Sequence, residues 1–220
     1  MAILLNIDTA VETASVCLSE DAHPIKMAAN DNQKDHAAWL HPAIQRLLQE
    51  AGMTVKDIDA VAVSIGPGSY TGLRVGLSAA KGLCYALGIP LITIGTLEIM
   101  ASAVKNTDVH LICPLIDARR MEVFAAVYDK SLTEVKKPYA MIINESSFSE
   151  FLSSNRVAFC GNGRKKLQNV LSDNNAIFST DIATALEMCP LSSRYFRERK
   201  FSDVAYTEPL YIKEFFSIKQ

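Results

Sequence analysis

The chain has 220 residues, of which 49% are hydrophobic and 21% charged, values typical of a globular protein with a buried core. A net charge of −2 excludes nucleic-acid binding driven by overall charge, so any RNA contact would need a local basic patch. Five scattered cysteines without a C-x-x-C pair favour a reducing compartment over a disulfide framework or a zinc site. No apolar stretch is long enough to span a membrane and the first residues read as a strand, so we expect a cytoplasmic protein.

The first hundred residues alternate between β-rich runs and stretches with helical spacing of apolar residues. Three strands come first and are followed by helices that alternate with strands. In chain order we expect strands at 2–8, 14–20 and 24–29, a helix at 36–51, a strand at 58–65, a helix at 71–87, a strand at 90–95 and a short helix at 96–104.

A second, weaker series of the same kind begins near Val109, with two paired strands on either side of Arg119 and Arg120. Three strands followed by alternating helices and strands is the order of a ribonuclease-H-like half. We therefore predict an α/β protein with a duplicated ribonuclease-H-like fold of the actin/hexokinase/Hsp70 superfamily, whose second half is reduced. The predicted domains are residues 1–105 and 106–220, and the last helix is free to pack back on the first half.

A glycine-rich stretch, residues 64–82, suggests a phosphate loop, but its spacing does not fit one. Counted from Gly66, the lysine position of the G-x-x-x-x-G-K-[ST] loop falls on Gly72. The third glycine of G-x-G-x-x-G falls on Thr71. Both nucleotide motifs are therefore excluded, and the glycines need another explanation.

The helix predicted at 71–87 offers one, because its small residues Gly72, Gly76 and Ala79 share a face with Leu83. A glycine inside a helix costs roughly 0.5–1 kcal/mol relative to alanine, so something must pack closely enough to offset that cost. Two interpretations are open at this point. Either the sheet and the helix at 36–51 supply the packing, or a partner protein does.

Several stretches, spread from end to end of the chain, together resemble the TsaB (YeaZ) family; they are ILLNIDTA, GPGSYTGLRVGLSAAKGL, PLIDARRMEVFAAVY and EPLYIKEF. The resemblance implies the superfamily fold and a role in making threonylcarbamoyladenosine beside the anticodon of tRNA. It implies a non-catalytic subunit that forms a heterodimer with its catalytic paralogue TsaD, is joined by the ATPase TsaE, and meets tRNA through the complex. Alone, such a chain is expected to form a homodimer.

This resemblance favours the partner interpretation of the small-residue helix. The helices at 36–51 and 71–87 would then pair with the equivalent helices of the paralogue. The residues predicted to face the partner are Leu40, Ile44, Leu47, Gly72, Gly76, Ala79 and Leu83.

The catalytic paralogue carries a His-x3-His metal pair, and the matching positions here are Thr96 and Met100, with Glu98 retained between them. Neither replacement is a good ligand for a hard or borderline metal. His36 and His41 are five residues apart and point to different sides of a helix, so they do not rescue the site. Ser69 is not in a G-x-S-x-G nucleophile turn. We expect no catalytic residue and no metal in this chain.

A vestigial nucleotide site would involve Asp8, Thr9, Arg119 and Gly161, because these positions match the superfamily's phosphate and adenosine turns. The two phosphate turns, at Asp8–Thr9 and at Arg119, lack the glycines found in active kinases. We therefore expect no cofactor on this chain alone, with ATP and metal in partner subunits. The alternative is a small-molecule kinase-like ATP-binding enzyme of the same superfamily. Basic clusters at 164–166 and 194–200 either guide tRNA or form solvated faces.

Overall fold

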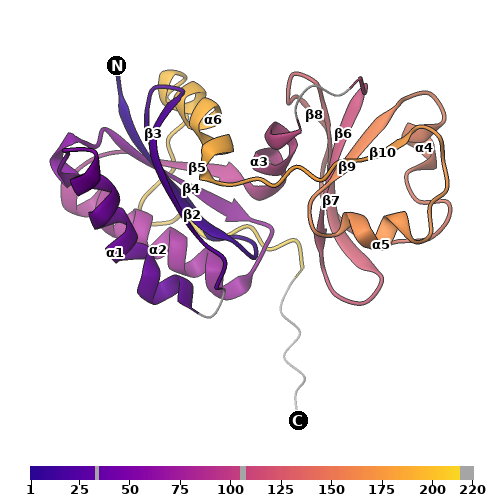
Figure 1. Ribbon diagram of the computed structural model, residues 1–220, viewed down its shortest axis with the longest axis horizontal. Helices are drawn as coiled ribbons and strands as arrows, with labels where there is room; N and C mark the ends of the chain where they lie inside the picture. Colours follow the sequence, from indigo (N-terminus) through magenta and orange to yellow (C-terminus); the bar gives the residue numbers. More distant parts are fainter. Residues whose placement is uncertain (33–34, 105–107, 214–220) are drawn as a thin grey trace, which may run out of the picture. The chain divides into compact units, whose positions relative to one another are not determined.

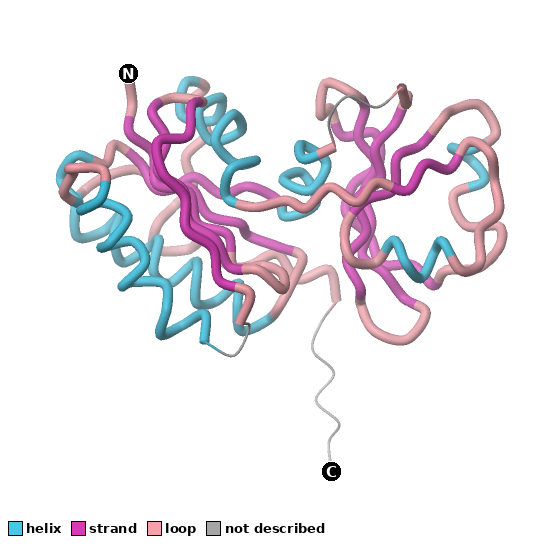
Figure 2. Tube along the Cα trace, in the orientation of Figure 1, coloured by secondary structure: helices cyan, strands magenta, loops and turns pink. Residues whose placement is uncertain are grey.

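The computed structural model describes residues 1–32, 35–104 and 108–213. The predicted domain boundary after residue 105 and the end of the EPLYIKEF stretch lie outside these residues. Two compact units are formed, the first by Met1–Ala103 with Ala183–Pro209 and the second by Val104–Ile182 with Leu210–Gln220. Each unit contains one five-stranded sheet (Figures 1 and 2). None of the helices formed by the described residues has the length and apolar character needed to cross a bilayer.

The sheet of the first unit has the strand order β3-β2-β1-β4-β5. β1 pairs antiparallel with β2 and parallel with β4, and β5 continues the parallel half. Its strands are β1 (Ile3–Asp8), β2 (Ala14–Glu20), β3 (His23–Asn30), β4 (Ala60–Gly66) and β5 (Leu91–Gly95).

Helices cover both faces of this sheet (Figure 1). α1 (His36–Glu50) and α2 (Tyr70–Leu87) pack on one face, where Leu5 and Ile7 of β1 join their core. α3 (Thr96–Ala103) and α6 (Ala185–Arg197) belong to the other face, where Asn6 of β1 donates a 3.8 Å hydrogen bond to Cys189 Sγ of α6. This division follows from the strand repeat, since successive side chains point to opposite faces. A single turn of 3-10 helix, η2 (Val55–Asp57), precedes β4.

The second unit repeats this topology with shorter helices. Its strand order is β10-β9-β6-β7-β8, and β6 again pairs antiparallel with the next strand in the chain and parallel with the fourth. Renumbered within its own unit, each sheet therefore reads 3-2-1-4-5, which confirms the duplicated ribonuclease-H-like fold. The elements are β6 (Leu111–Asp117), β7 (Glu122–Asp129), β8 (Glu134–Ile142), α4 (Ser149–Leu152), β9 (Val157–Cys160), α5 (Arg164–Gln168) and β10 (Ala176–Phe178).

The second half is reduced in its helices more than in its sheet. α4 and α5 have four and five residues, whereas α1 and α2 of the first unit have 15 and 18. The core of this unit accordingly depends on aromatic side chains, with Phe159 between Phe148 and Phe178 at centroid distances of 5.1 and 5.7 Å.

Residues 183–209 belong to the first unit, so the last helix does pack back on the first half, as the prediction allowed, and the second unit is shorter than the predicted domain of 106–220. α6 buries Ala185, Met188 and Leu191 against the first sheet. After α6 the chain runs along the edge strand β5, where the Ser202 amide donates to the Leu91 carbonyl at 2.8 Å. Residues 106–220 therefore do not form one continuous domain. The face of the first sheet opposite α1 and α2 is covered by α6.

Candidate functional site

The start of α2 packs directly on the loop that follows β1. The Thr9 hydroxyl donates a 2.7 Å hydrogen bond to the Gly72 carbonyl, and the Ser69 amide donates to the Ala10 carbonyl at 2.7 Å. A Cβ added at Gly72 would overlap the Thr9 carbonyl oxygen, and one added at Gly76 would overlap the Thr9 hydroxyl. The two glycines therefore let β1 and its loop approach α2 within the same unit.

This packing overturns the predicted partner contacts. Six of the seven residues are buried inside the first unit, and Leu83 is half-buried against the same core. Their assignment as a surface that meets a partner is wrong, because β1 and the neighbouring helix already cover them. A helical wheel shows which side chains share a face, not which chain covers that face. The six buried residues are Leu40, Ile44, Leu47, Gly72, Gly76 and Ala79.

The exposed side of α1 and α2 is a different set of residues. α2 exposes Ser78, Gly82 and Tyr85, and Tyr85 is 85% exposed. α1 lies beside α2 (Figure 1) and exposes His41 and Gln45 on its own outer side. A Cβ added at Gly82 would have no atom of the described residues within 4 Å apart from its own helix and chain neighbours. Unlike Gly72 and Gly76, this glycine has no explanation in the packing of the described residues of its own unit, and it was not among the predicted partner residues.

Between the two positions that match the paralogue's metal pair, Glu98 forms an ion pair with Arg194. Thr96 and Met100 are buried on α3, and Thr96 Oγ1 has no hydrogen-bond partner among the residues that the structure describes. Glu98 accepts hydrogen bonds from Arg194 Nη2 at 2.7 Å and from the Tyr195 hydroxyl at 2.9 Å. Burial raises the pKa of Glu98, while Tyr195 and Arg194 oppose that shift. The described residues contain no group of three or more histidine, cysteine or acidic side chains arranged for a metal ion.

The side chains of Asp8 and Thr9 form hydrogen bonds within the first unit. Asp8 is buried, and its Oδ1 accepts a 3.0 Å hydrogen bond from the Ala10 amide. Burial raises the pKa of Asp8, and hydrogen bonds from Ser64 and Ala10 oppose the rise. Since the Thr9 hydroxyl is engaged with α2, both side chains act as packing groups in this structure.

Arg119 and Gly161 belong to the second unit, so the predicted nucleotide residues come as two pairs, each described within its own unit. Arg119 lies in the turn between β6 and β7 with φ of 69°, and Arg120 follows with φ of 49°. Gly161 has φ of 84°, which glycine adopts without strain, and its carbonyl accepts a 3.1 Å hydrogen bond from Arg164 Nη1.

Comparison with known proteins places these observations in a family. The family model described as TsaD, tRNA N6-adenosine threonylcarbamoyltransferase, matches residues 29–206, which is more than half of the chain. The Bacillus subtilis protein TsaB, named a tRNA threonylcarbamoyladenosine biosynthesis protein, is 35% identical over 125 residues, 57% of this chain but only 54% of its own length. The Escherichia coli protein of the same name is 29% identical over 223 residues, covering 96% of this chain and 94% of its own.

Solved structures agree on the fold. YeaZ from Pseudomonas aeruginosa superposes with a TM-score of 0.84 at 23% identity, over 96% of this chain and all of that one. A second P. aeruginosa structure, described as similar to peptidase YEAZ, superposes with a TM-score of 0.86 at 23% identity, covering 97% of this chain and all of that one. The chain therefore belongs to the family that the TsaD model describes, and its relatives place it with the TsaB (YeaZ) proteins.

Proposed function

We propose that this chain is a non-catalytic subunit required for threonylcarbamoyl transfer to the adenosine beside the anticodon of tRNA. It acts in a heterodimer with a TsaD-like catalytic paralogue, which a TsaE-like ATPase joins. The pathway follows from the names of the relatives, which are tRNA threonylcarbamoyladenosine biosynthesis proteins. ATP and metal are held by the partner subunits, and this chain supplies a binding surface.

The observation that carries the non-catalytic role is the state of Glu98. Its neighbours at the paralogue's metal-ligand positions, Thr96 and Met100, are poor ligands, and the carboxylate is already engaged by Arg194 and Tyr195. A guanidinium 2.7 Å away would have to leave before a cation could bind there. The donor set therefore does not fit the metal that the paralogue's motif implies.

The kinase alternative has less support in the first unit. A phosphate group would need donors at the end of β1, where the Thr9 hydroxyl instead binds the Gly72 carbonyl and Asp8 is buried. Isothermal titration of the isolated chain with Mg-ATP separates the two functions. We expect no saturable heat in the micromolar range, and micromolar binding with turnover would favour the kinase.

The surface we propose for the partner is the outer side of α1 and α2, centred on Gly82. A glycine in the interior of an exposed helix costs about 1 kcal/mol relative to alanine, and no atom of this unit requires it. Close approach by a helix of another chain would explain it, with the exposed Tyr85 one turn away as a contact residue. In the absence of the paralogue, a second copy of the chain would cover the same surface.

Reconstitution of transfer to an unmodified tRNA transcript tests the function itself. The catalytic paralogue, the ATPase and the substrates are incubated with and without this chain, and labelled threonine incorporated into tRNA is counted. We expect incorporation to require the chain and to persist when Arg194 is replaced by methionine. Full incorporation without the chain would contradict the proposal.

A further inference from the structure

The turn between β6 and β7 places two consecutive arginines in the left-handed region of backbone space. Arg119 and Arg120 have φ of 69° and 49°, a region that glycine and asparagine adopt more readily than long side chains. The Asp117 carboxylate steadies the turn by accepting a 2.6 Å hydrogen bond from the Arg119 amide. Both arginine side chains are exposed. The backbone is thus strained at two residues whose side chains contribute nothing to the core.

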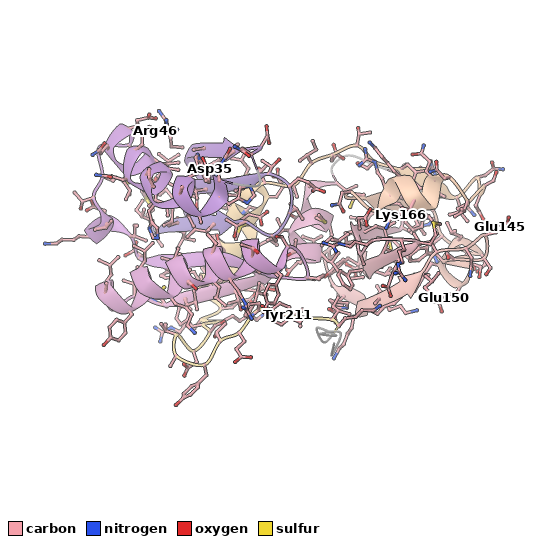
Figure 3. All side chains as sticks on the ribbon, turned by 90° about the horizontal axis from the view of Figure 1, so that it is seen from below. Asp35, Arg46, Glu145, Glu150, Lys166 and Tyr211 are labelled. Carbon is pink, nitrogen blue, oxygen red and sulfur yellow. The ribbon has the colours of Figure 1, made fainter. Side chains whose placement is uncertain are left out.

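A second basic segment lies against this turn. Lys166 of α5, labelled in Figure 3, donates a 2.6 Å hydrogen bond to Asp117 Oδ1 and a 3.0 Å hydrogen bond to the Glu122 carbonyl. The Asp117 amide donates to Asn162 Oδ1 at 2.8 Å, which ties the loop before α5 to the end of β6. Lys213 reaches the same place and pairs with Glu122 at 2.5 Å.

We define the basic surface as the six cations carried by the β6–β7 turn, by α5 and by Lys213, because these contacts join the three segments. Two of them, Lys166 and Lys213, are paired with Asp117 and Glu122. Of the other four, Arg119, Arg120 and Lys165 are exposed, and none of these three forms an ion pair with a carboxylate of the described residues. The six residues are Arg119, Arg120, Arg164, Lys165, Lys166 and Lys213.

The basic cluster of the first unit differs in this respect. Arg194 is paired with Glu98 at 2.7 Å, and Lys200 is paired with Glu198 at 2.6 Å. Two of the four cations in this cluster are therefore paired, which leaves an excess of about two positive charges, whereas the basic surface of the second unit, with two of six paired, keeps an excess of about four.

We propose that the basic surface of the second unit binds the phosphate backbone of tRNA. The proposal rests on the proposed function, since that function brings tRNA to the complex. Arginine forks bind phosphate oxygens in two parallel hydrogen bonds, and a turn that projects two adjacent forks can engage consecutive phosphates. Such contacts position the nucleic acid and carry no base specificity, which suits a subunit that orients tRNA for a catalytic partner.

The test measures binding of an unmodified tRNA transcript by fluorescence anisotropy, for the full chain and for its reconstituted complex, between 50 and 200 mM KCl. The test variant is Arg119→Gln/Arg120→Gln. The control is Lys130→Gln/Lys137→Gln, which removes the same charge from exposed positions of the same unit, away from the β6–β7 turn. Loss of two phosphate contacts lowers the slope of log affinity against log salt by about 1.4–1.8. If the affinities of the two proteins converge near 1 M salt, binding of the variant is about a hundredfold weaker at 50 mM and about ten- to twentyfold weaker at 200 mM.

The control variant is expected to bind within about threefold of the unchanged protein at every salt concentration. Equal losses in the two variants would show that net charge alone matters and would overturn the proposal. So would a test variant that binds as the unchanged protein does.

A glycine variant separates binding from a structural role of the turn. Arg120→Gly relieves the left-handed strain, so we expect a higher melting temperature together with weaker tRNA binding. A lower melting temperature with unchanged binding would assign Arg120 to the fold and contradict the proposal. Failure of this proposal can be told apart from failure of the proposed function. Transfer that does not require the chain would refute the subunit role, whereas only the tRNA-binding data test the basic surface.

Discussion

Gly72→Ala and Gly82→Ala are the same substitution in one helix, and the structure predicts opposite effects for them. The Cβ added at Gly72 would overlap the Thr9 carbonyl oxygen and lie 3.2 Å from its carbon, which is backbone and cannot rotate away. Overpacking of this kind costs about 1–3 kcal/mol, and disturbing the Thr9–Gly72 hydrogen bond costs about 1 kcal/mol more. Alanine returns about 1 kcal/mol through helix propensity, so the expected net loss is about 2 kcal/mol.

At Gly82 only the propensity term applies, because an added Cβ has open space around it. Gly82→Ala should therefore stabilise the chain by about 0.5–1 kcal/mol. A change of 1 kcal/mol moves the melting temperature by about 2–4 °C for a protein of this size, so Gly72→Ala should melt about 4–8 °C lower and Gly82→Ala about 2 °C higher. Differential scanning calorimetry measures both. A Gly72→Ala variant as stable as the unchanged protein would refute the account of how α2 packs.

Three further predictions concern buried polar groups. Burial raises the folded-state pKa of Asp8 above its ordinary 3.8, so ionisation disfavours folding as pH rises. The stability of Asp8→Asn relative to the unchanged protein should therefore increase in urea titrations as the pH rises above 3.8, and a pH-independent difference would contradict this. Arg194→Met strands a largely buried Glu98 and should cost about 1–3 kcal/mol, whereas adding Glu98→Gln should recover part of that loss in the same titrations. All five thiols, including the Cys17–Cys189 pair at 3.5 Å, are buried, so Ellman's reagent should react slowly with the native protein and with five thiols after denaturation.

Local signals predicted most of the first unit well. The predicted helix at 71–87 differs from α2 by only one residue. The bounds agree because Ser69 caps the start of the helix and Gly88, with φ of 67°, ends it. The order of strands and helices along the first unit was also predicted, because each element shows its own spacing of apolar residues. These features depend on spacing and turn chemistry, which the sequence displays directly.

The remaining features depend on contacts between distant residues. The fit of Thr9 against Gly72 joins residues 63 positions apart, and the contact of Asn6 with Cys189 joins residues 183 apart. The helical spacing of α2 correctly indicated that something covers its small face, but the spacing is the same whether β1 or a partner does so. The sequence shows Gly82 as a glycine inside a helix, but only the structure shows that the described residues of its own unit do not pack against it.

The left-handed backbone at Arg119 and Arg120 could not be predicted from the sequence either. The sequence marks the two arginines as adjacent to a hairpin, but not as left-handed, because nothing in their type predicts a positive φ.

The central claim is that this chain supports tRNA modification by binding a partner through the outer side of α1 and α2. The most direct measurement titrates the chain into a fixed amount of catalytic paralogue, ATPase and tRNA, and follows the initial rate of threonylcarbamoyl transfer. Gly82→Leu should need about tenfold more chain for half-saturation, a loss of 1.4 kcal/mol in binding, yet reach the same maximal rate. Ser154→Leu, which adds the same side chain to an exposed position of the second unit, should titrate as the unchanged protein does. A Gly82→Leu curve that coincides with this control, or a lower maximal rate at unchanged half-saturation, would contradict the claim.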